Sequence, residues 1–238
     1  MEYTITHLRT TDSTNSYLAH HGGEGCHVVW TDFQTAGRGS GHNRWESEDG
    51  SNLLFSMLIH PHSLLPASQF RVSMAISLAI VRTLKPLLQE FECSGCRGLS
   101  IKWPNDIYWN DSKLAGILIE NRLGSRQIIQ SIIGVGLNVN QTQFLSEAPN
   151  PISLRTITGR CHDREHLLHS IVRAFTLDFD AFDYRSLLYR RNGFFTYSDA
   201  NGTFEAEMET VEDDGHLILR DRQGRLRSYA FKEVQYDL

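Results

Sequence analysis

The chain has 238 residues, a length that allows one large domain, alone or with a small one, and excludes a protein of many domains. Hydrophobic residues make up 40% of it and charged residues 21%, which is ordinary globular usage, so the chain can bury a real core and need not be disordered. The formal net charge of −5 offers no general attraction to nucleic acid or to an anionic membrane, so the composition argues against a dedicated DNA-binding protein.

The sequence shows no sign of export or of membrane attachment. Four cysteines are too few for a disulfide scaffold, and residues 1–11 contain neither the basic nor the apolar part of a leader peptide. The longest apolar run, 72–81, is much shorter than the roughly 20 residues that cross a bilayer, and we expect a buried helix there. These features predict a cytoplasmic protein.

In the first half of the chain, the spacing between hydrophobic residues changes from segment to segment, which distinguishes helices from strands. A short helix is predicted at 12–20, and a long one at 68–84 that Pro86 should end or kink. Strands are expected where short apolar runs lie between turn residues. These runs are 26–33, 52–59, 100–103, 107–109, 114–120 and 128–135. The last four predict a mostly antiparallel meander.

The second half begins with helical spacing and ends with alternation. Apolar residues at helical intervals predict a helix over 163–182, with Asp163 as its cap. From residue 203 onward, polar and apolar residues alternate between turn signals, which predicts short strands. We therefore expect a small β-barrel after a boundary near 184–191.

The long connector 35–50 carries an unusual glycine pattern. Glycines alternate at positions 37, 39 and 41, where they let the backbone approach a ligand with its N–H groups pointing at negative charge. Arg38 and Arg44 add cationic donors, and Trp45 adds a stacking surface. The segment predicts a site for an anion, most plausibly phosphate; a flexible surface loop is an equally good interpretation of the composition.

A second motif places two lysines near a proline turn. In Lys-Trp-Pro-Asn-Asp, Lys102 and Asp106 flank the turn at Pro104, and Lys113 stands where the next strand begins. An ammonium group at Lys113 can neutralise a carboxylate and a phosphate together. The alternative, and the commoner situation, is a solvated hairpin lysine.

Three further patterns carry weaker signals. In Gly-Val-Gly-Leu-Asn, residues 134–138, Asn138 suits either an adenine or ribose contact or a turn, and the glycines suit close packing of strands. His162 to His166 matches a zinc-peptidase string, but Asp163 at the cap places His162 outside the helix and favours exposed histidines. Cys93 and Cys96 form a lone C-x-x-C, for which we expect two free thiols.

Taken in order, five motifs resemble those of biotin–protein ligases. They are 12–15 (Asp-Ser-Thr-Asn), the glycine loop ending at Trp45, 102–106, 113–120 (Lys-Leu-Ala-Gly-Ile-Leu-Ile-Glu) and 134–138. The resemblance covers about residues 10–140 strongly and the remainder more loosely, and 231–234 is similar to the closing strand of the family's C-terminal domain. The segments starting at Lys102 and Lys113 are its most specific parts.

The resemblance implies an α+β fold with a mixed, mostly antiparallel sheet flanked by helices, like the catalytic domain of class II synthetases. This domain would cover 1–186, and a small SH3-like β-barrel would cover 187–238. The implied reaction has two steps: the carboxylate of biotin attacks the α-phosphorus of ATP to give biotinyl-5'-AMP, and a lysine of a biotin carboxyl carrier protein then takes the biotinyl group. Mg²⁺ would accompany ATP, with no cage made of protein ligands alone.

The resemblance also implies roles for individual residues. The expected catalytic residues are Lys113, Arg38 and Asp106, the last to orient or deprotonate the incoming lysine. The expected biotin-binding residues are Ser13, Thr14, Asn15, Gln34, Arg38, Gly39, Ser40 and Lys113. The expected ATP-binding residues are Gly37, Arg38, Arg44, Trp45, Lys102 and Asn138. The protein would act as a monomer or homodimer, without DNA or a membrane.

The loop departs from the fuller family pattern. Many members continue it with further arginines, whereas this chain has Ser-Gly-His-Asn at 40–43, and Arg44 would compensate one position along. Loop 35–50 is expected to order over the adenylate and to exclude water, because a mixed anhydride hydrolyses. This departure puts retention of the intermediate in doubt.

Two alternatives remain beside the biotin ligase. A lipoate- or octanoate-protein ligase shares the architecture, but its branch has an arginine- and glycine-rich stretch that this sequence lacks. Ligases that also repress transcription carry an N-terminal helix-turn-helix domain, and only twelve residues precede Ser13. We therefore expect a ligase rather than a biotin-sensing regulator.

Overall fold

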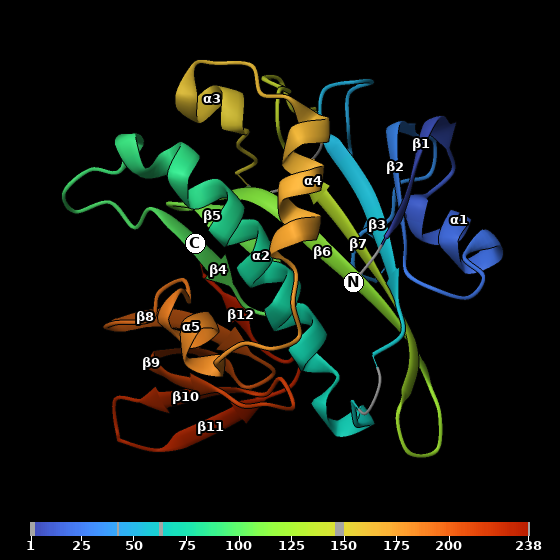
Figure 1. The fold of residues 1–238 in the computed structure, drawn as a ribbon. Coiled ribbons are helices and arrows are strands. Elements are labelled where there is room, and N and C mark those ends of the chain that lie inside the picture. Colours follow the sequence, from blue (N-terminus) through green and yellow to red (C-terminus); the bar gives the residue numbers. More distant parts are fainter. Residues whose placement is uncertain (1–2, 42, 62–63, 146–149, 238) are drawn as a thin grey trace.

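The computed structural model describes residues 3–41, 43–61, 64–145 and 150–237. Its centre is a seven-stranded mixed sheet in the order β1-β2-β3-β7-β6-β5-β4 (Figure 1). β1 runs parallel to β2, and the other neighbours in this sheet are antiparallel. The strands are β1 Thr4–Thr11, β2 His27–Gln34, β3 Leu53–Ile59, β4 Leu99–Lys102, β5 Asp106–Trp109, β6 Ser112–Leu123 and β7 Ile128–Leu137. The predicted antiparallel meander is confirmed, and β1 was not predicted.

Helices cover both faces of this sheet, so its central strands are buried on both sides. β3 is buried at every position, because one face of the strand packs in the main core and the other face is covered on the α1 side. Met57 packs in the main core with α2 (Phe70–Leu88) and α4 (Arg164–Ala174), whereas Leu58 packs in a small core with Leu18 of α1 (Thr14–His21). The α1 face keeps room for a site beside that small core.

The long helix α2 continues beyond the point where the sequence suggested an end. Pro86 lies inside it and removes one backbone donor, but Leu84 and Leu88 on either side are fully buried and hold the last turn on the core. With its flanking turns η1 (Pro66–Ser68) and η2 (Gln89–Phe91), this helix is long and apolar enough to cross a membrane. However, 67% of its most apolar window is buried inside the fold. It is the central core helix that the apolar run at 72–81 predicted.

The predicted helix at 163–182 is wrong in its second half. Asp163 caps α4 as expected, since its side chain accepts from the His166 N–H, but the backbone becomes extended at Phe175. A new helix, α5 (Ala181–Ser186), begins at Asp180, whose carboxylate accepts from the Phe182 N–H. The short helix α3 (Leu154–Thr158) was not predicted.

The two cysteines of the C-x-x-C sequence are joined in a disulfide, so the prediction of two free thiols is wrong. Their Cα atoms lie 5.3 Å apart in the loop before β4, which is within the range that a disulfide spans. Cys26 and Cys161 are free thiols.

The C-terminal strands form a second, antiparallel sheet of five strands in the order β11-β10-β9-β8-β12 (Figure 1). They are β8 Phe194–Asp199, β9 Gly202–Val211, β10 Leu217–Asp221, β11 Leu226–Tyr229 and β12 Gln235–Tyr236. Buried residues of this sheet, such as Tyr197 and Leu219, belong to the same continuous core as α2. The expected boundary near 184–191 therefore marks a change of sheet within one continuous hydrophobic core.

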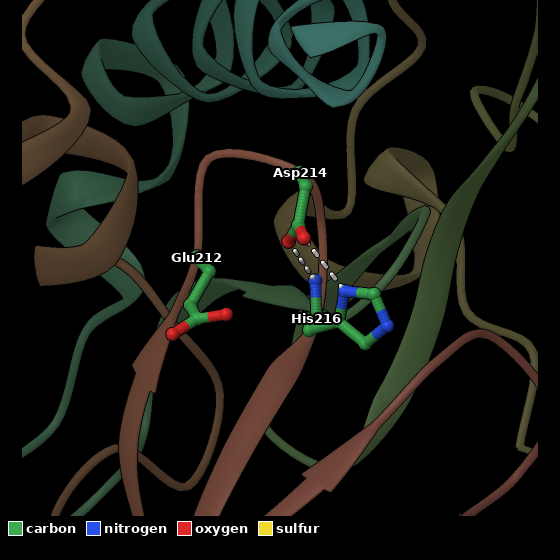
Figure 2. Close-up of side chains that lie close together, drawn as sticks. All are labelled: Glu212, Asp214 and His216. Carbon is green, nitrogen blue, oxygen red and sulfur yellow. Dashed lines mark hydrogen bonds and ion pairs between the residues drawn. The ribbon is translucent and has the colours of Figure 1, made fainter. Parts of the chain in front are cut away.

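The turn between β9 and β10 docks on the first sheet. Trp103, which is 3% exposed, donates from its indole N–H to the Gly215 carbonyl at 2.9 Å. The same turn carries Glu212, Asp214 and His216, whose polar atoms converge near the surface (Figure 2). The hydrogen bond from His216 to the Asp214 carboxylate, 3.0 Å long, raises the pKa of that histidine. The second sheet is thus anchored on a tryptophan of the 102–106 motif.

Candidate functional site

A cavity of about 1130 Å³ lies on the α1 face of the first sheet. Its walls come from the glycine loop, the 102–106 turn, β6, β7 and the C-terminal segment 231–236. Most of the predicted site residues line it, namely Ser13, Thr14, Asn15, Gln34, Arg38, Gly39, Ser40, Arg44, Trp45, Lys102, Asp106, Lys113 and Asn138. The fold thus joins motifs that are more than a hundred residues apart.

The charge of the cavity is opposite to that of the chain. Five cationic side chains line it, against two carboxylates, those of Glu46 and Asp106. The cationic residues are Arg38, Arg44, Lys102, Lys113 and Lys232. Because the whole protein carries a formal charge of −5, this local excess of positive charge suits a polyanionic ligand.

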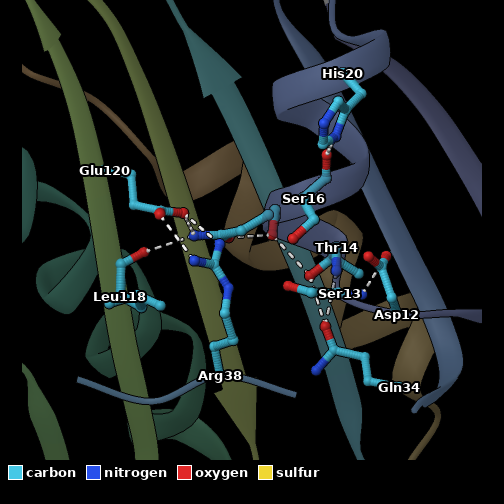
Figure 3. Close-up of polar contacts among 11 residues, drawn as sticks. Asp12, Ser13, Thr14, Ser16, His20, Gln34, Arg38, Leu118 and Glu120 are labelled. Carbon is cyan, nitrogen blue, oxygen red and sulfur yellow. Dashed lines mark hydrogen bonds and ion pairs between the residues drawn. The ribbon is translucent and has the colours of Figure 1, made fainter. Parts of the chain in front are cut away.

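One end of the cavity is a fixed hydrogen-bond network at the start of α1. The Gln34 side-chain oxygen accepts from both the backbone N–H and the hydroxyl of Thr14, at 2.8 and 3.1 Å (Figure 3). Ser56, fully buried on β3, has its hydroxyl 2.7 Å from that of Thr14 and 2.6 Å from Asn15 Oδ1. These groups suit recognition of a small neutral polar ligand group, because their geometry is set in advance.

Arg38 crosses from the glycine loop to β6 and forms a two-pronged ion pair with Glu120. The two nitrogen–oxygen distances are 3.1 and 2.8 Å, and Figure 3 shows both contacts. Glu120 also accepts from the Asn15 side-chain amide at 2.7 Å. It therefore links the loop to α1, a role that the sequence analysis missed although Glu120 closes the motif at 113–120.

The glycines of β6 and β7 clear the floor of the cavity. A Cβ at Gly134 would overlap the Asn15 amide oxygen, and a Cβ at Gly116 or Gly136 would overlap the indole of Trp45. The 134–138 glycines do mark a place of close packing, but the expectation of a neighbouring backbone is wrong, because the neighbours are the side chains of Asn15 and Trp45. The Trp45 indole therefore lies directly against Gly116 and Gly136 of the sheet.

Lys113 is held in the cavity by Asp106. Its ammonium nitrogen lies 2.8 Å from Asp106 Oδ1 and 5.7 Å from the centre of the Trp45 ring. The lysine and aspartate side chains are only 25% and 19% exposed. The solvated hairpin lysine is therefore excluded, and the ammonium is available to an anion in the cavity.

Lys102 lies deeper, between aromatic rings. It donates to the Tyr108 hydroxyl at 3.0 Å, and its nitrogen is 5.2 Å from the centre of the Tyr236 ring, which belongs to the second sheet. Burial lowers the pKa of this lysine to about 8, against the opposing effect of Asp106. The ammonium of Lys102 is therefore charged at neutral pH, and it begins to lose its proton only slightly above neutral pH.

Asn138 is engaged by the backbone. Its side-chain amide donates to the Ile152 carbonyl at 3.1 Å and to that of Lys113 at 3.4 Å, and it is 3% exposed. This arrangement favours the turn interpretation: Asn138 fixes the backbone of Lys113 while its surface forms part of the cavity wall.

The glycine loop folds as a small hairpin at the cavity mouth. Trp45 N–H donates to the Gly37 carbonyl at 3.0 Å, and Gly39 N–H donates to the Asn43 carbonyl at 2.8 Å. A Cβ at Gly37 would overlap the Trp45 carbonyl, so this glycine shapes the hairpin without lining the cavity. His42 lies outside the described residues.

A metal cage is not formed by the side chains of the cavity. In the described part of the chain, one group of three converging histidine, cysteine or carboxylate ligands occurs, Glu212 with Asp214 and His216, and none of the three lines the cavity. His162, outside helix α4 as predicted, is bonded to the Thr158 hydroxyl at 2.8 Å and forms no such group with His166.

Comparison with known sequences gives a family match. A profile described as "Biotin/lipoate A/B protein ligase family" matches residues 7–138. The biotin–[acetyl-CoA-carboxylase] ligase of Paracoccus denitrificans is 30% identical over 236 residues, covering 92% of this chain and 95% of that protein. The bifunctional ligase/repressor BirA of Bacillus subtilis is 29% identical, covering 94% of this chain and 70% of that protein.

Comparison with solved structures supports the same fold. The biotin protein ligase of Aquifex aeolicus, determined in complex with biotin and ATP, superposes with a TM-score of 0.79 over 98% of this chain and 99% of that one. The sequence identity of this pair is 21%, so the match concerns the fold. It extends over both sheets and therefore includes the C-terminal strands.

Proposed function

The chain belongs to the biotin/lipoate A/B protein ligase family, and from this premise we propose that it is a biotin–protein ligase. It activates biotin with ATP to give biotinyl-5'-AMP and pyrophosphate, and it transfers the biotinyl group to a lysine of a biotin-dependent carboxylase. The full-length relatedness to the Paracoccus denitrificans ligase supports this activity. The acceptor lysine belongs, in this proposal, to a biotin carboxyl carrier protein.

The Lys113–Asp106 pair is the observation that carries the mechanism. The first step brings a carboxylate and a phosphate together, and their repulsion must be offset. The ammonium of Lys113 is fixed by Asp106 at 2.8 Å, on the cavity wall beside Trp45. It therefore stabilises the negative charge that builds up between the two reacting groups.

The hydrogen-bond network at α1 is the proposed biotin end. Ser13, Thr14, Asn15 and Gln34 supply neutral donors and acceptors of fixed direction, which suit the ureido group of biotin. Arg38, Gly39 and Ser40 of the loop lie over the ligand, and the Arg38–Glu120 ion pair ties that loop to the sheet. This arrangement excludes water from the adenylate.

The other end is the proposed ATP site. Arg44 and Lys102 attract the phosphates, Trp45 covers the adenine side, and Gly37 and Asn138 keep the loop and the wall in shape. Mg²⁺ fits here in the manner usual for nucleotide enzymes, which hold it through substrate phosphates and one or two carboxylates. Asp106 and Glu46 are the carboxylates that line the cavity, and the ion would screen the leaving pyrophosphate.

Asp106 is also the proposed partner of the incoming lysine. Its carboxylate lines the cavity and is paired with Lys113, so it can orient the acceptor amine toward the mixed anhydride. The amine then attacks the biotinyl carbonyl, an amide bond forms, and AMP leaves.

Transfer to a carrier domain tests the function. Purified protein incubated with biotin, MgATP and a biotin carboxyl carrier domain should biotinylate that domain, detected with streptavidin and by the mass of added biotin. A carrier whose acceptor lysine is changed to arginine is the matched control. Absence of biotin transfer with an intact, folded enzyme would refute the proposal.

A further inference from the structure

Among the described residues that line the cavity, Lys232 is the cation that comes from the C-terminal segment 231–236. It lies in the turn between β11 and β12, and its side chain lines the same cavity as Lys113. Its ammonium reaches the glycine loop, because a Cβ at Gly41 would overlap Lys232 Nζ. Two segments almost two hundred residues apart in sequence thus meet over the cavity mouth.

The described loop residues beside Gly41 carry no cationic side chain. Between Arg38 and Arg44, the described loop residues are Gly39, Ser40, Gly41 and Asn43, none of them charged. Arg38 is already paired with Glu120. Among the described residues between Arg38 and Arg44, no side chain therefore supplies a positive charge near Gly41.

The charge on Lys232 has no neutralising partner among the described residues. No described carboxylate forms an ion pair with it, and the neighbouring Glu233 carboxylate accepts from the Ala230 N–H at 2.7 Å. Arg44 and Lys102 likewise have no ion pair within the described ranges. The two other cavity cations, Arg38 and Lys113, are both paired with carboxylates.

The backbone at Lys232 supports a specific role for its side chain. Its φ angle is +72°, in the left-handed region that favours glycine or asparagine. A lysine there costs conformational energy, and the turn holds its side chain toward the loop. Arg44, Lys102 and Lys232, the three cavity cations without ion pairs among the described residues, all line the same cavity.

Building on the proposed function, we propose that Lys232 binds the phosphate chain of ATP at its leaving-group end and supplies a positive charge beside Gly41, where the described loop side chains are uncharged. The ATP site is then shared between the two sheets: the glycine loop and the first sheet form its wall, and the C-terminal turn adds a cation.

Charge variants of the full-length protein separate this role from a structural one. Lys232→Met removes the charge and keeps the length, Lys232→Arg keeps the charge, and Lys232→Glu reverses it. Lys85→Met, on the exposed side of α2, is the matched control outside the cavity. Circular dichroism and thermal unfolding verify that each variant is folded.

The measurements are the KM values for ATP and biotin in biotin-dependent ATP–pyrophosphate exchange, and calorimetric titrations with each ligand alone. Loss of a charge-assisted contact should raise the KM for ATP about tenfold in Lys232→Met and further in Lys232→Glu. Lys232→Arg should stay within about threefold of the wild type, and biotin affinity should stay within about twofold in all variants.

An unchanged KM for ATP, an equal loss in Lys232→Arg, or a lower kcat without a change in the KM for ATP would overturn the assignment. If the wild-type protein showed no biotin-dependent exchange, the proposed function would fail. ATP titration of the wild type and Lys232→Met would still decide the role of Lys232, because equal affinities would contradict it.

Discussion

The ammonium nitrogen of Lys113 lies 2.8 Å from Asp106 Oδ1, and this ion pair joins the start of β6 to the start of β5 inside the cavity. Asp106 fixes the position of the lysine without removing it from the cavity wall, so the charge is in place before substrates arrive. The pair therefore combines two proposed tasks: activation of biotin depends on the lysine, and transfer depends on the carboxylate.

Replacement of Lys113 by methionine should nearly abolish activation. The variant keeps the length of the side chain and loses the charge that offsets carboxylate–phosphate repulsion, so exchange should fall at least about a hundredfold. Biotin-dependent ATP–pyrophosphate exchange measures this, with circular dichroism to verify the fold and Lys85→Met as control. Near-normal exchange in Lys113→Met would remove Lys113 from the mechanism.

Asp106→Asn should affect transfer more than activation. The amide still reaches Lys113 but cannot carry the negative charge that orients the acceptor amine. We expect biotin transfer to a carrier domain to fall about tenfold more than pyrophosphate exchange does. Equal losses in both assays would mean that Asp106 acts through Lys113 alone.

Alanine substitutions at Gly134 and Gly136, on the floor of the cavity, should affect its two ends differently. Gly134→Ala places a Cβ on the Asn15 amide oxygen, whereas Gly136→Ala places one on the Trp45 indole. The first variant should raise the KM for biotin, and the second should raise the KM for ATP and speed loss of the adenylate. Each variant is the control for the other, and identical kinetic effects would contradict the division.

Lys102 should give the reaction a pH dependence above neutrality. Burial lowers the pKa of this lysine to about 8, so it is charged below that pH and loses its charge as the pH rises through it. Its attraction for phosphate is lost in the same direction, and kcat/KM for ATP should decline above about pH 8. Lys102→Arg, which stays charged, should delay that decline; an unchanged profile would exclude Lys102 as its cause.

Trp103→Phe tests the contact between the sheets. The variant keeps most of the buried aromatic surface. It removes the indole N–H, which donates a 2.9 Å hydrogen bond to the Gly215 carbonyl. The free energy of unfolding should fall by about 1 kcal/mol, measured by urea denaturation. Unchanged stability, together with unchanged KM for ATP, would show that the hydrogen bond is not needed to hold the second sheet.

The sequence predicted which motifs form the site, but it did not predict the residues from distant elements that contact them. Asp106 follows the turn at Pro104, and Lys113 lies at the start of the next strand but one. Their proximity could therefore be expected from local spacing. The contacts of Glu120 with Arg38 and Asn15 depend on how three distant elements pack, and no local pattern encodes that. Lys232 was missed for the same reason, since its turn meets the loop only in the folded chain.

The errors in the elements have comparable causes. β1 was missed because its pattern mixes polar and apolar residues at an edge with limited burial. The helix expected over 163–182 follows a good hydrophobic period, but Asp180 starts a new helix after extended backbone at Phe175. Pro86 remains inside α2 because Leu84 and Leu88 are buried, a tertiary effect that outweighs propensity.

The most direct test of the central claim is ATP–pyrophosphate exchange by the purified protein, with biotin compared against lipoate as the acid. The account predicts exchange that depends on biotin and MgATP, is not supported by lipoate, and is lost in Lys113→Met. Exchange with lipoate and none with biotin would contradict it and would assign the chain to the lipoate branch of its family.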